Sequence, residues 1–248
     1  MTDAAELAAL LRTARHAVIF TGAGISTGSG IPDFRSPGGI WSLMMPVAFE
    51  DYIADPAARR LSWQRRFEME ATWNRVRPNA GHYAVADLVT RGIVSHVITQ
   101  NIDGLHQASG VADAKVIELH GNTRFAKCLD CGARVEIPVI RAHFESHGDA
   151  PDCVLCAGIV KSATISFGQP MPADAMARAE EATSGSDLFV VLGSSLGVFP
   201  AAGFPLAAKR RGTKLVIVNR EETPQDPIAS LVINAEISPI LTAAIQAL

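Results

Sequence analysis

Cysteine is scarce in this chain of 248 residues, and the four that it has all lie between positions 128 and 156. In a chain that we expect to remain in the cytoplasm, such clustering indicates a metal site and not a set of disulfides. The first six residues contain no basic segment and no apolar core ahead of a cleavage site. Their composition therefore predicts that the chain carries no export signal.

The chain also lacks an excess of charge and an uninterrupted apolar segment that could cross a membrane. Its 22 basic and 25 acidic residues give a net charge of −3 and form no basic stripe, which excludes nucleic-acid binding as the main function. Residues 188–208 carry no charge, but glycines and prolines such as Gly193, Gly197 and Pro200 interrupt them. Interruptions of this kind predict a strand, a loop and the start of a helix, and no membrane partner.

What is abundant is apolar sequence, at 48% of all residues, which is enough to build a sizeable core. Buried strands are predicted from short apolar runs at 17–21, 93–98, 116–119, 187–192, 214–218 and 231–233. Helical patterns lie between or beside them, at 4–15, 78–92, 173–182 and 239–248. This alternation is typical of an α/β protein with a Rossmann-like parallel sheet covered by helices on both faces.

We assign residues 1–35, 78–121 and 166–248 to this Rossmann-like domain. The helical segment 36–77 and the zinc-ribbon segment 122–165 are predicted insertions that together form a smaller domain. The second insertion holds all four cysteines, as two Cys-x₂-Cys pairs with residues 132–152 between them. Each pair can turn two thiolates toward one ion, and four thiolates fill a tetrahedral shell with no position left for a reacting water. We therefore predict one structural zinc ion, held by Cys128, Cys131, Cys153 and Cys156.

A candidate nucleotide site begins where the predicted strand 17–21 runs into Gly22-Ala-Gly-Ile-Ser26. Glycines at this place permit a tight turn and let a diphosphate approach backbone N–H groups. Thr27 replaces the third glycine of the usual dinucleotide fingerprint, so an ordinary turn is the alternative interpretation. The acid, aromatic and base at Asp33-Phe34-Arg35 favour the nucleotide pocket.

Polar side chains follow the other strands, at the sheet edge where open α/β proteins bind ligands. Gln100, Asn101 and Asp103 can hydrogen-bond ribose, a carboxamide or water, although Asp103 can instead cap the next helix. His120 follows the third strand and is well placed as a general base, the alternative being a structural histidine. A second small-residue loop that suits phosphate or ribose is Gly193-Ser194-Ser195.

With these motifs in place, the chain resembles the sirtuins, the NAD-dependent protein lysine deacylases, over essentially its full length. The resemblance rests on Gly22–Ser26 with Gly30–Arg35, on Thr99-Gln-Asn-Ile-Asp-Gly-Leu-His106, on Glu118-Leu-His-Gly121, on the cysteine pairs, and on Phe167-Gly168, Gly193-Ser-Ser195 and Asn219. It implies a deacetylase that binds NAD in the Rossmann-like domain and an acyl-lysine protein or peptide in the cleft between the domains. The implied products are free lysine, nicotinamide and O-acyl-ADP-ribose.

The same resemblance implies roles for individual residues. His120 is the expected catalytic base, Asn101 orders water, and Phe34 shields the reacting face. The residues expected around NAD are Gly22, Ala23, Gly24, Ser26, Asp33, Phe34, Arg35, Gln100, Asn101, Ile102, Asp103, Gly193, Ser194, Ser195, Asn219 and Glu221. The residues expected to contact the extended substrate backbone are Phe167, Gly168, Gln169, Gly197, Val198 and Phe199.

The chain departs from the sirtuin pattern in two places. Many sirtuins have Arg-Pro-Asp-Val-Val before Phe-Gly-Glu, whereas this chain has Lys161-Ser-Ala-Thr-Ile-Ser-Phe-Gly-Gln169. The chain thereby lacks an acidic residue of the pattern, which affects the expected peptide preference. Members that favour acidic acyl groups pair a tyrosine with an arginine three residues later, whereas this chain has Trp63 and Arg66. Both are candidate substrate-binding residues on one helix face, with core packing as the alternative, and the missing hydroxyl predicts a preference for acetyl.

Two other functions remain open. The same pocket can serve ADP-ribosyl transfer to protein or hydrolysis of NAD. The second alternative is of another class: a zinc-ribbon module that senses NAD or ADP-ribose without turnover. A pure binder needs neither a base nor a water-ordering amide, so His120 and Asn101 favour an enzyme.

Overall fold

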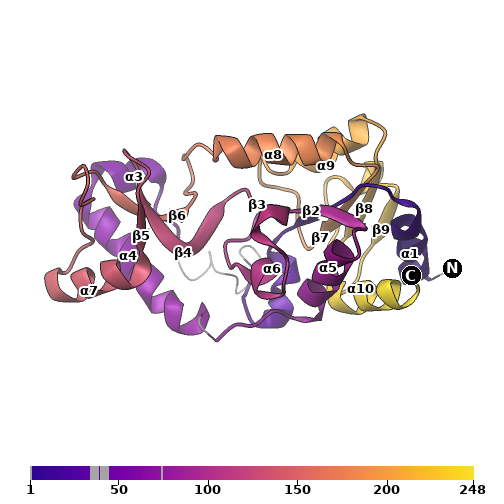
Figure 1. The fold of residues 1–248 in the computed structure, drawn as a ribbon, viewed down its shortest axis with the longest axis horizontal. Coiled ribbons are helices and arrows are strands. Elements are labelled where there is room, and N and C mark those ends of the chain that lie inside the picture. The colour runs from indigo at the N-terminus through magenta and orange to yellow at the C-terminus, as the bar shows by residue number, and fades with distance from the viewer. Residues whose placement is uncertain (1, 34–38, 40–44, 74) are drawn as a thin grey trace.

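The computed structural model describes residues 2–33, 39, 45–73 and 75–248, arranged as two lobes along the long axis of the molecule (Figure 1). Both chain termini lie at the outer end of the larger lobe. None of the described helices is long and apolar enough to cross a membrane.

The larger lobe is built on a six-stranded sheet whose strands are all parallel. Across the sheet the strands run in the order β3 (Val116–Glu118), β2 (Val94–Thr99), β1 (Ala17–Thr21), β7 (Leu188–Leu192), β8 (Lys214–Val218) and β9 (Leu231–Ile233). The direction of winding changes between β1 and β7, which is where such sheets open a ligand crevice at the carboxyl ends of the strands. The predicted parallel sheet is confirmed.

Helices cover both faces of this sheet (Figure 1). One face packs against α1 (Asp3–Thr13), α5 (Ala80–Thr90) and α10 (Ile237–Gln246), and the other against α8 (Ala173–Ser184) and α9 (Gly203–Arg210). Successive residues of β1 and β7 point to opposite faces, so Ile19 and Val190 join the first core while Phe20 and Phe189 join the second. Burial on both faces explains why these strands are continuous apolar runs in the sequence.

In the residues that the structure describes, the smaller lobe combines a three-stranded antiparallel sheet with three helices. Its sheet has the order β5 (Arg134–Glu136), β4 (Gly121–Cys128) and β6 (Val160–Thr164), and its helices are α3 (Phe49–Ala54), α4 (Pro56–Trp73) and α7 (Ile137–His147). Pro56 is the first residue of α4, where a missing backbone N–H costs no hydrogen bond. The core of the lobe contains Trp63 and Ile140 together with Cys128 and Cys153, so packing and the cysteine site form one unit.

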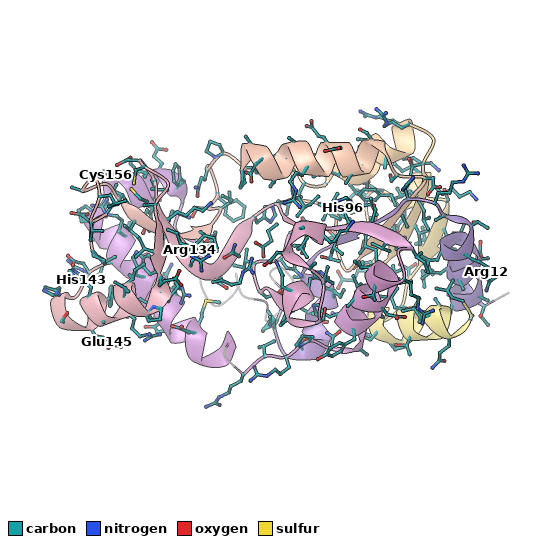
Figure 2. All side chains as sticks on the ribbon, viewed as in Figure 1. Arg12, His96, Arg134, His143, Glu145 and Cys156 are labelled. Carbon is teal, nitrogen blue, oxygen red and sulfur yellow. The ribbon has the colours of Figure 1, made fainter. Side chains whose placement is uncertain are left out.

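Helix α7 lies between the two cysteine pairs, where the sequence predicts only a ribbon. Gly148 ends it with a left-handed backbone (φ +82°). His143, at the outer end of the lobe (Figure 2), lies one turn from His147 on this helix, and their ring centroids are 4.1 Å apart. Short helical turns complete the fold: η1 (Ala23–Ile25), η2 (Thr27–Ser29), α6 (Leu105–Ala108), η3 (Asp113–Lys115) and η4 (Asp226–Ile228).

Candidate active site

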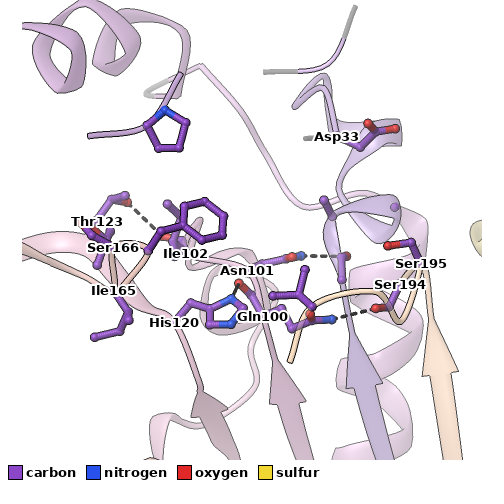
Figure 3. Close-up of a pocket in the computed structure, with 18 of the residues that line it drawn as sticks. Asp33, Gln100, Asn101, Ile102, His120, Thr123, Ile165, Ser166, Ser194 and Ser195 are labelled. Atoms are coloured by element: carbon purple, nitrogen blue, oxygen red, sulfur yellow. Dashed lines mark hydrogen bonds between the residues drawn. The ribbon is translucent and has the colours of Figure 1, made fainter. Parts of the chain in front are cut away.

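The carboxyl ends of the parallel strands open into a cavity of about 630 Å³ that is lined by residues of both lobes (Figure 3). His120 lines it, together with these residues expected around NAD: Gly22, Ala23, Gly24, Asp33, Gln100, Asn101, Ile102, Gly193, Ser194, Ser195, Asn219 and Glu221. Ser26 and Asp103 are not part of the lining. Phe34 and Arg35 lie outside the described residues.

The loops after β1 and β7 lie in direct contact at the floor of the cavity. A Cβ atom on Gly22 would lie 2.6 Å from the Gly193 oxygen, and one on Gly24 would lie 2.7 Å from the Gly193 Cα. The Gly24 N–H donates to the Gly193 oxygen (2.9 Å) and the Gly22 N–H to the Leu192 oxygen (3.1 Å). These glycines are therefore required by the packing of two loops. The N–H groups of Gly22 and Gly24 are bonded within the protein, and both residues line the cavity.

The walls around this floor fit a dinucleotide. Gln100 donates from Nε2 to Ser194 Oγ (2.8 Å), which fixes an amide and a hydroxyl side by side at the ends of β2 and β7. Ser195 and Asn219 add further small polar groups to the lining. Hydroxyl and amide groups of this kind can hydrogen-bond ribose and phosphate oxygens, and the glycine floor leaves them room.

His120 is held in one tautomer by the backbone. Its Nδ1 lies 2.9 Å from the carbonyl oxygen of Gln100, which can only accept, so Nδ1 carries the hydrogen and Nε2 keeps a lone pair. Burial lowers the pKa of His120 below its usual 6.5, and the bond to Gln100 opposes this shift only in part. His120 is therefore a neutral base at pH 7 with its accepting nitrogen free of the Gln100 contact.

Asn101 is fixed so that its amide nitrogen is used within the protein. Nδ2 donates to the Gly22 oxygen (3.0 Å) and to Ser26 Oγ (3.2 Å), and the backbone N–H donates to Thr99 Oγ1 (3.0 Å). Both amide hydrogens are thereby engaged. What Asn101 offers to a ligand or water is the acceptor Oδ1.

Ser26 and Asp103 form a supporting layer behind Asn101. Ser26 Oγ donates to Asp103 Oδ2 (2.7 Å), and Asp103 Oδ1 accepts the Leu105 N–H at the start of α6 (2.9 Å). His82 completes a capping box with Asn79 at the start of α5, and its Nε2 lies 3.4 Å from Ser26 Oγ. Burial lowers the pKa of His82 to about 4, so this layer holds a neutral imidazole.

On the substrate side, Phe167, Gly168, Gln169, Val198 and Phe199 line the cavity, while Gly197 does not. The side chains of Phe167 and Phe199 are 50% and 66% exposed, which places two large apolar groups beside the opening. The Phe167 oxygen accepts the Phe49 N–H (2.9 Å), so part of this segment already pairs with the smaller lobe.

Trp63 and Arg66 are separated by the fold although they share a helix. Trp63 is 2% exposed, stacks on Phe67 at 5.6 Å in the core of the smaller lobe, and is not among the residues that line the cavity. Arg66 does line it. Its Nη2 donates to the Thr123 oxygen (2.8 Å) and its Nη1 lies 3.4 Å from Glu70 Oε2.

The four cysteine sulfur atoms converge at the far end of the smaller lobe, where Figure 2 labels Cys156. All four lie within 4.8 Å of one another, with Cys128–Cys156 and Cys131–Cys153 separations of 3.5 and 3.6 Å between Sγ atoms. Zinc–sulfur bonds of ~2.3 Å in a tetrahedron place sulfur atoms ~3.8 Å apart. The cluster therefore fits one structural zinc ion.

Three residues of the cavity wall carry no signal in the sequence. Arg220, in the loop after β8, lies 3.5 Å from Glu236 in the turn before α10. It also lies 4.0 Å from Asp33 in the loop after η2, so its guanidinium links these three segments. Thr123 bridges the lobes, because its N–H and Oγ1 both donate to the Ile102 oxygen (3.1 and 3.0 Å). These three residues, Thr123, Arg220 and Glu236, have charged or hydroxyl side chains of a kind too common for their positions in the sequence to identify them.

Comparisons with known proteins agree with this geometry. The model of the Sir2 family matches residues 22–200. A protein of Rhodopseudomonas palustris named NAD-dependent protein deacetylase is 54% identical over 236 residues, which cover 95% of this chain and 93% of the relative. NAD-dependent protein deacetylase 2 of Streptomyces coelicolor is 43% identical, over 93% of this chain and 96% of its own length. A solved Sir2 structure with a p53 peptide and NAD+ superposes with a TM-score of 0.86 at 38% identity, covering 97% of this chain and 96% of its own.

Proposed function

Since this chain belongs to the Sir2 family and is an NAD-dependent protein deacetylase, we propose that His120 and Asn101 carry out its chemistry in the cavity between the lobes. The observation that supports this assignment most is the bond from His120 Nδ1 to the Gln100 oxygen, because it leaves Nε2 as an acceptor in the same cavity as Asn101. NAD supplies the glycosidic bond that is broken and the ADP-ribose that accepts the acyl group.

The residues around the cavity have distinct tasks in this proposal. His120 Nε2 takes the proton from a ribose hydroxyl, and Asn101 Oδ1 orders water or ribose. Gln100, Ser194, Ser195, Asn219 and the backbone of Ile102 hold the dinucleotide. Asp103 and Ser26 hold Asn101 and the loop that follows it in position. The exposed rings of Phe167 and Phe199 flank an extended acyl-lysine peptide.

The division of the chain at 35/36, 77/78, 121/122 and 165/166 is part of the same proposal. Its support is that the two sheets have separate cores, with the sheet of the smaller lobe drawn from residues 121–164. A cytoplasmic location is also proposed, because four free cysteines that converge on one metal site suit a reducing compartment.

Analysis of the products tests the function directly. Incubated with NAD and an acetyl-lysine peptide, the protein is expected to form nicotinamide, deacetylated peptide and O-acetyl-ADP-ribose in equal amounts, as followed by chromatography and mass spectrometry. NAD consumed at the same rate without peptide, or ADP-ribose attached to protein as the main product, would instead support hydrolysis or transfer. Binding of NAD without any product would support the sensor.

The pH profile of the reaction should report the buried state of His120. Because burial lowers its pKa, the neutral, accepting form persists below pH 6.5, and the acid limb of kcat/KM is expected to have its midpoint below that value. The measurement is kcat/KM with an acetyl peptide from about pH 4.5 to about pH 8. A midpoint above 6.5 would contradict the assignment.

Unfolding must be followed at each pH as a control. The folded-state pKa of His82, about 4, lies below its unfolded value of 6.5, so the unfolded chain binds more protons between these values. The contribution of His82 to stability is therefore complete above 6.5 and is lost as pH falls from 6.5 toward 4. Only points at which the protein remains folded report on His120.

Acyl preference tests the position of Arg66. Because both terminal nitrogens of Arg66 are engaged by Glu70 and the Thr123 oxygen, we expect acetyl to be preferred over succinyl by about 10-fold or more in kcat/KM. The remaining succinyl activity should fall in Arg66→Met by roughly another 10-fold, the value of one charge-assisted hydrogen bond. Arg65→Met, a neighbouring arginine of the same lining, is the matched control. A parent protein that prefers succinyl would show that Glu70 does not occupy Arg66 in solution.

A further inference from the structure

Asn101 is the one member of a buried polar cluster that reaches the cavity. The side chains of this cluster come from four separate segments of the chain, and no member is more than 6% exposed: Thr21, Ser26, His82, Thr99, Asn101 and His106. Burying polar groups is costly unless each finds a partner, and a network whose members are bonded to one another is rigid. The cluster can therefore fix the place of Asn101 precisely.

His106 begins a line of hydrogen bonds that ends on the backbone of Asn101. Its Nε2 lies 3.0 Å from Thr21 Oγ1, and Thr21 Oγ1 donates to Thr99 Oγ1 (2.7 Å). Thr99 Oγ1 in turn accepts the Asn101 N–H (3.0 Å). Because Thr21 gives its one hydrogen to Thr99, it can only accept from His106, so Nε2 carries the hydrogen of the imidazole.

The other properties of His106 agree with this tautomer. Its Nδ1 has no hydrogen-bond partner in the part of the chain that the structure describes, as suits the nitrogen without a hydrogen. Burial, with a smaller effect of His82, lowers the pKa of His106 to about 3, so the ring is neutral at pH 7. His106 therefore contributes one N–H donor and neither a charge nor a base.

A second histidine holds the ring of His106 in place. The two rings meet edge to face, with 5.2 Å between the centroids of His82 and His106. His82 is itself fixed, because its Nδ1 accepts the Asn79 N–H (3.3 Å) and its Nε2 then donates to Ser26 Oγ (3.4 Å). The donor of His106 is thus aimed at Thr21 by a neighbour that has no freedom to turn.

We propose that His106 is a positioning residue for deacetylation, which sets the place of Asn101 Oδ1 through Thr21 and Thr99. The inference rests on the proposed role of Asn101 in the deacetylase function. His106 does not line the cavity, so it acts on the reaction only through Asn101. A glutamine amide can supply the same single N–H donor, whereas a phenyl ring fills the space of the imidazole but donates nothing.

The experiment compares His106→Phe with His106→Gln in single-turnover deacetylation of an acetyl peptide, with Tm measured for each variant. We expect His106→Phe to lower the rate by about 10-fold, the effect of one buried hydrogen bond left unmade. His106→Gln should stay within about 3-fold of the parent rate, because the donor is restored. If His106 only packed the core, the aromatic variant would instead be the more active of the two.

Combining His106→Phe with Asn101→Ala tests whether the effect passes through Asn101. Asn101→Ala removes the side chain that the line positions, but it keeps the backbone N–H. In this background His106→Phe should change the single-turnover rate by less than about 2-fold, because the two changes remove the same contribution. A further loss of about 10-fold would show that His106 acts on something else and would overturn the inference.

Thr21→Val breaks the same line at its middle and keeps the shape of the side chain, so it gives the same test if His106→Phe does not fold. We expect a loss similar to that of His106→Phe. His96→Phe is the matched control, because His96 lies on β2 but takes no part in these hydrogen bonds, and it should keep the parent rate.

The outcomes separate the inference from the function on which it rests. A parent rate in His106→Phe or in Thr21→Val, together with a low rate in Asn101→Ala, would overturn the inference alone. A parent rate in Asn101→Ala would refute the proposed role of Asn101 and the inference with it. Absence of NAD-dependent acetyl removal by the parent protein would refute the proposed function itself.

Discussion

Replacing His120 with alanine is expected to lower kcat/KM for deacetylation by about 100-fold or more, the usual cost of losing a positioned base. The imidazole Nε2 is the acceptor that the bond from Nδ1 to the Gln100 oxygen leaves available. NAD affinity should stay near the parent value, because the bond from Gln100 to Ser194 does not involve His120. Peptide assays give the rate, and titration calorimetry gives the NAD affinity.

His96→Ala provides a matched control for that variant. His96, labelled in Figure 2, also has a pKa lowered by burial, but it lies on β2 and is not among the residues that line the cavity. We expect parent activity from it. Near-parent deacetylation by His120→Ala would remove His120 from the mechanism, and equal losses in both variants would indicate a general effect on folding.

Replacing Cys128 or Cys153 with serine is expected to abolish zinc binding and to lower Tm by about 10 °C or more. Both sulfur atoms belong to the metal cluster and both residues are buried in the core of the smaller lobe, so the variants lose a ligand and its packing together. Deacetylation should fall with the fold, because Arg66, Thr123 and Ser162 come from this lobe. Metal analysis and thermal unfolding provide the measurements.

His143→Ala tests whether the loss is specific to the sulfur cluster. His143 lies between the two cysteine pairs, on α7, but is not one of the four ligands. We expect the His143→Ala variant to bind zinc and to have the Tm of the parent protein. A soluble Cys128→Ser protein without zinc, but with parent Tm and activity, would show that the four sulfur atoms do not hold a structural metal.

The sheet was predictable from the sequence because its strands are buried on both faces. Such strands, for example β7 with Phe189 and Val190 in opposite cores, are unbroken apolar runs that few other structures produce. Helix α7 was not predictable in this way, because the cysteine pairs on either side suggested a ribbon for the whole segment. Its amphipathic face becomes clear only with Ile137 and Ile140 in the core.

In the candidate site, the sequence indicated which loops meet but not what each group contacts. Gly22 and Gly24 line the cavity, and the structure adds a second reason for them that the sequence did not indicate, their close approach to Gly193, distant in sequence. Trp63 and Arg66 share a predicted face, yet Trp63 packs in the core and Arg66 reaches the cavity. These outcomes depend on contacts between distant segments, which local spacing does not contain.

The contact between the loops after β1 and β7 has a consequence for the order in which the chain folds during synthesis. Strand β1 emerges early from the ribosome, but its neighbour β7 and the Gly193 that fits against Gly22 and Gly24 emerge only after both cysteine pairs. The smaller lobe, complete in sequence by Thr164, can take up metal and fold first. The glycine floor between β1 and β7 is assembled last, so a nascent chain that stops before residue 188 has a zinc site but no place for the cofactor.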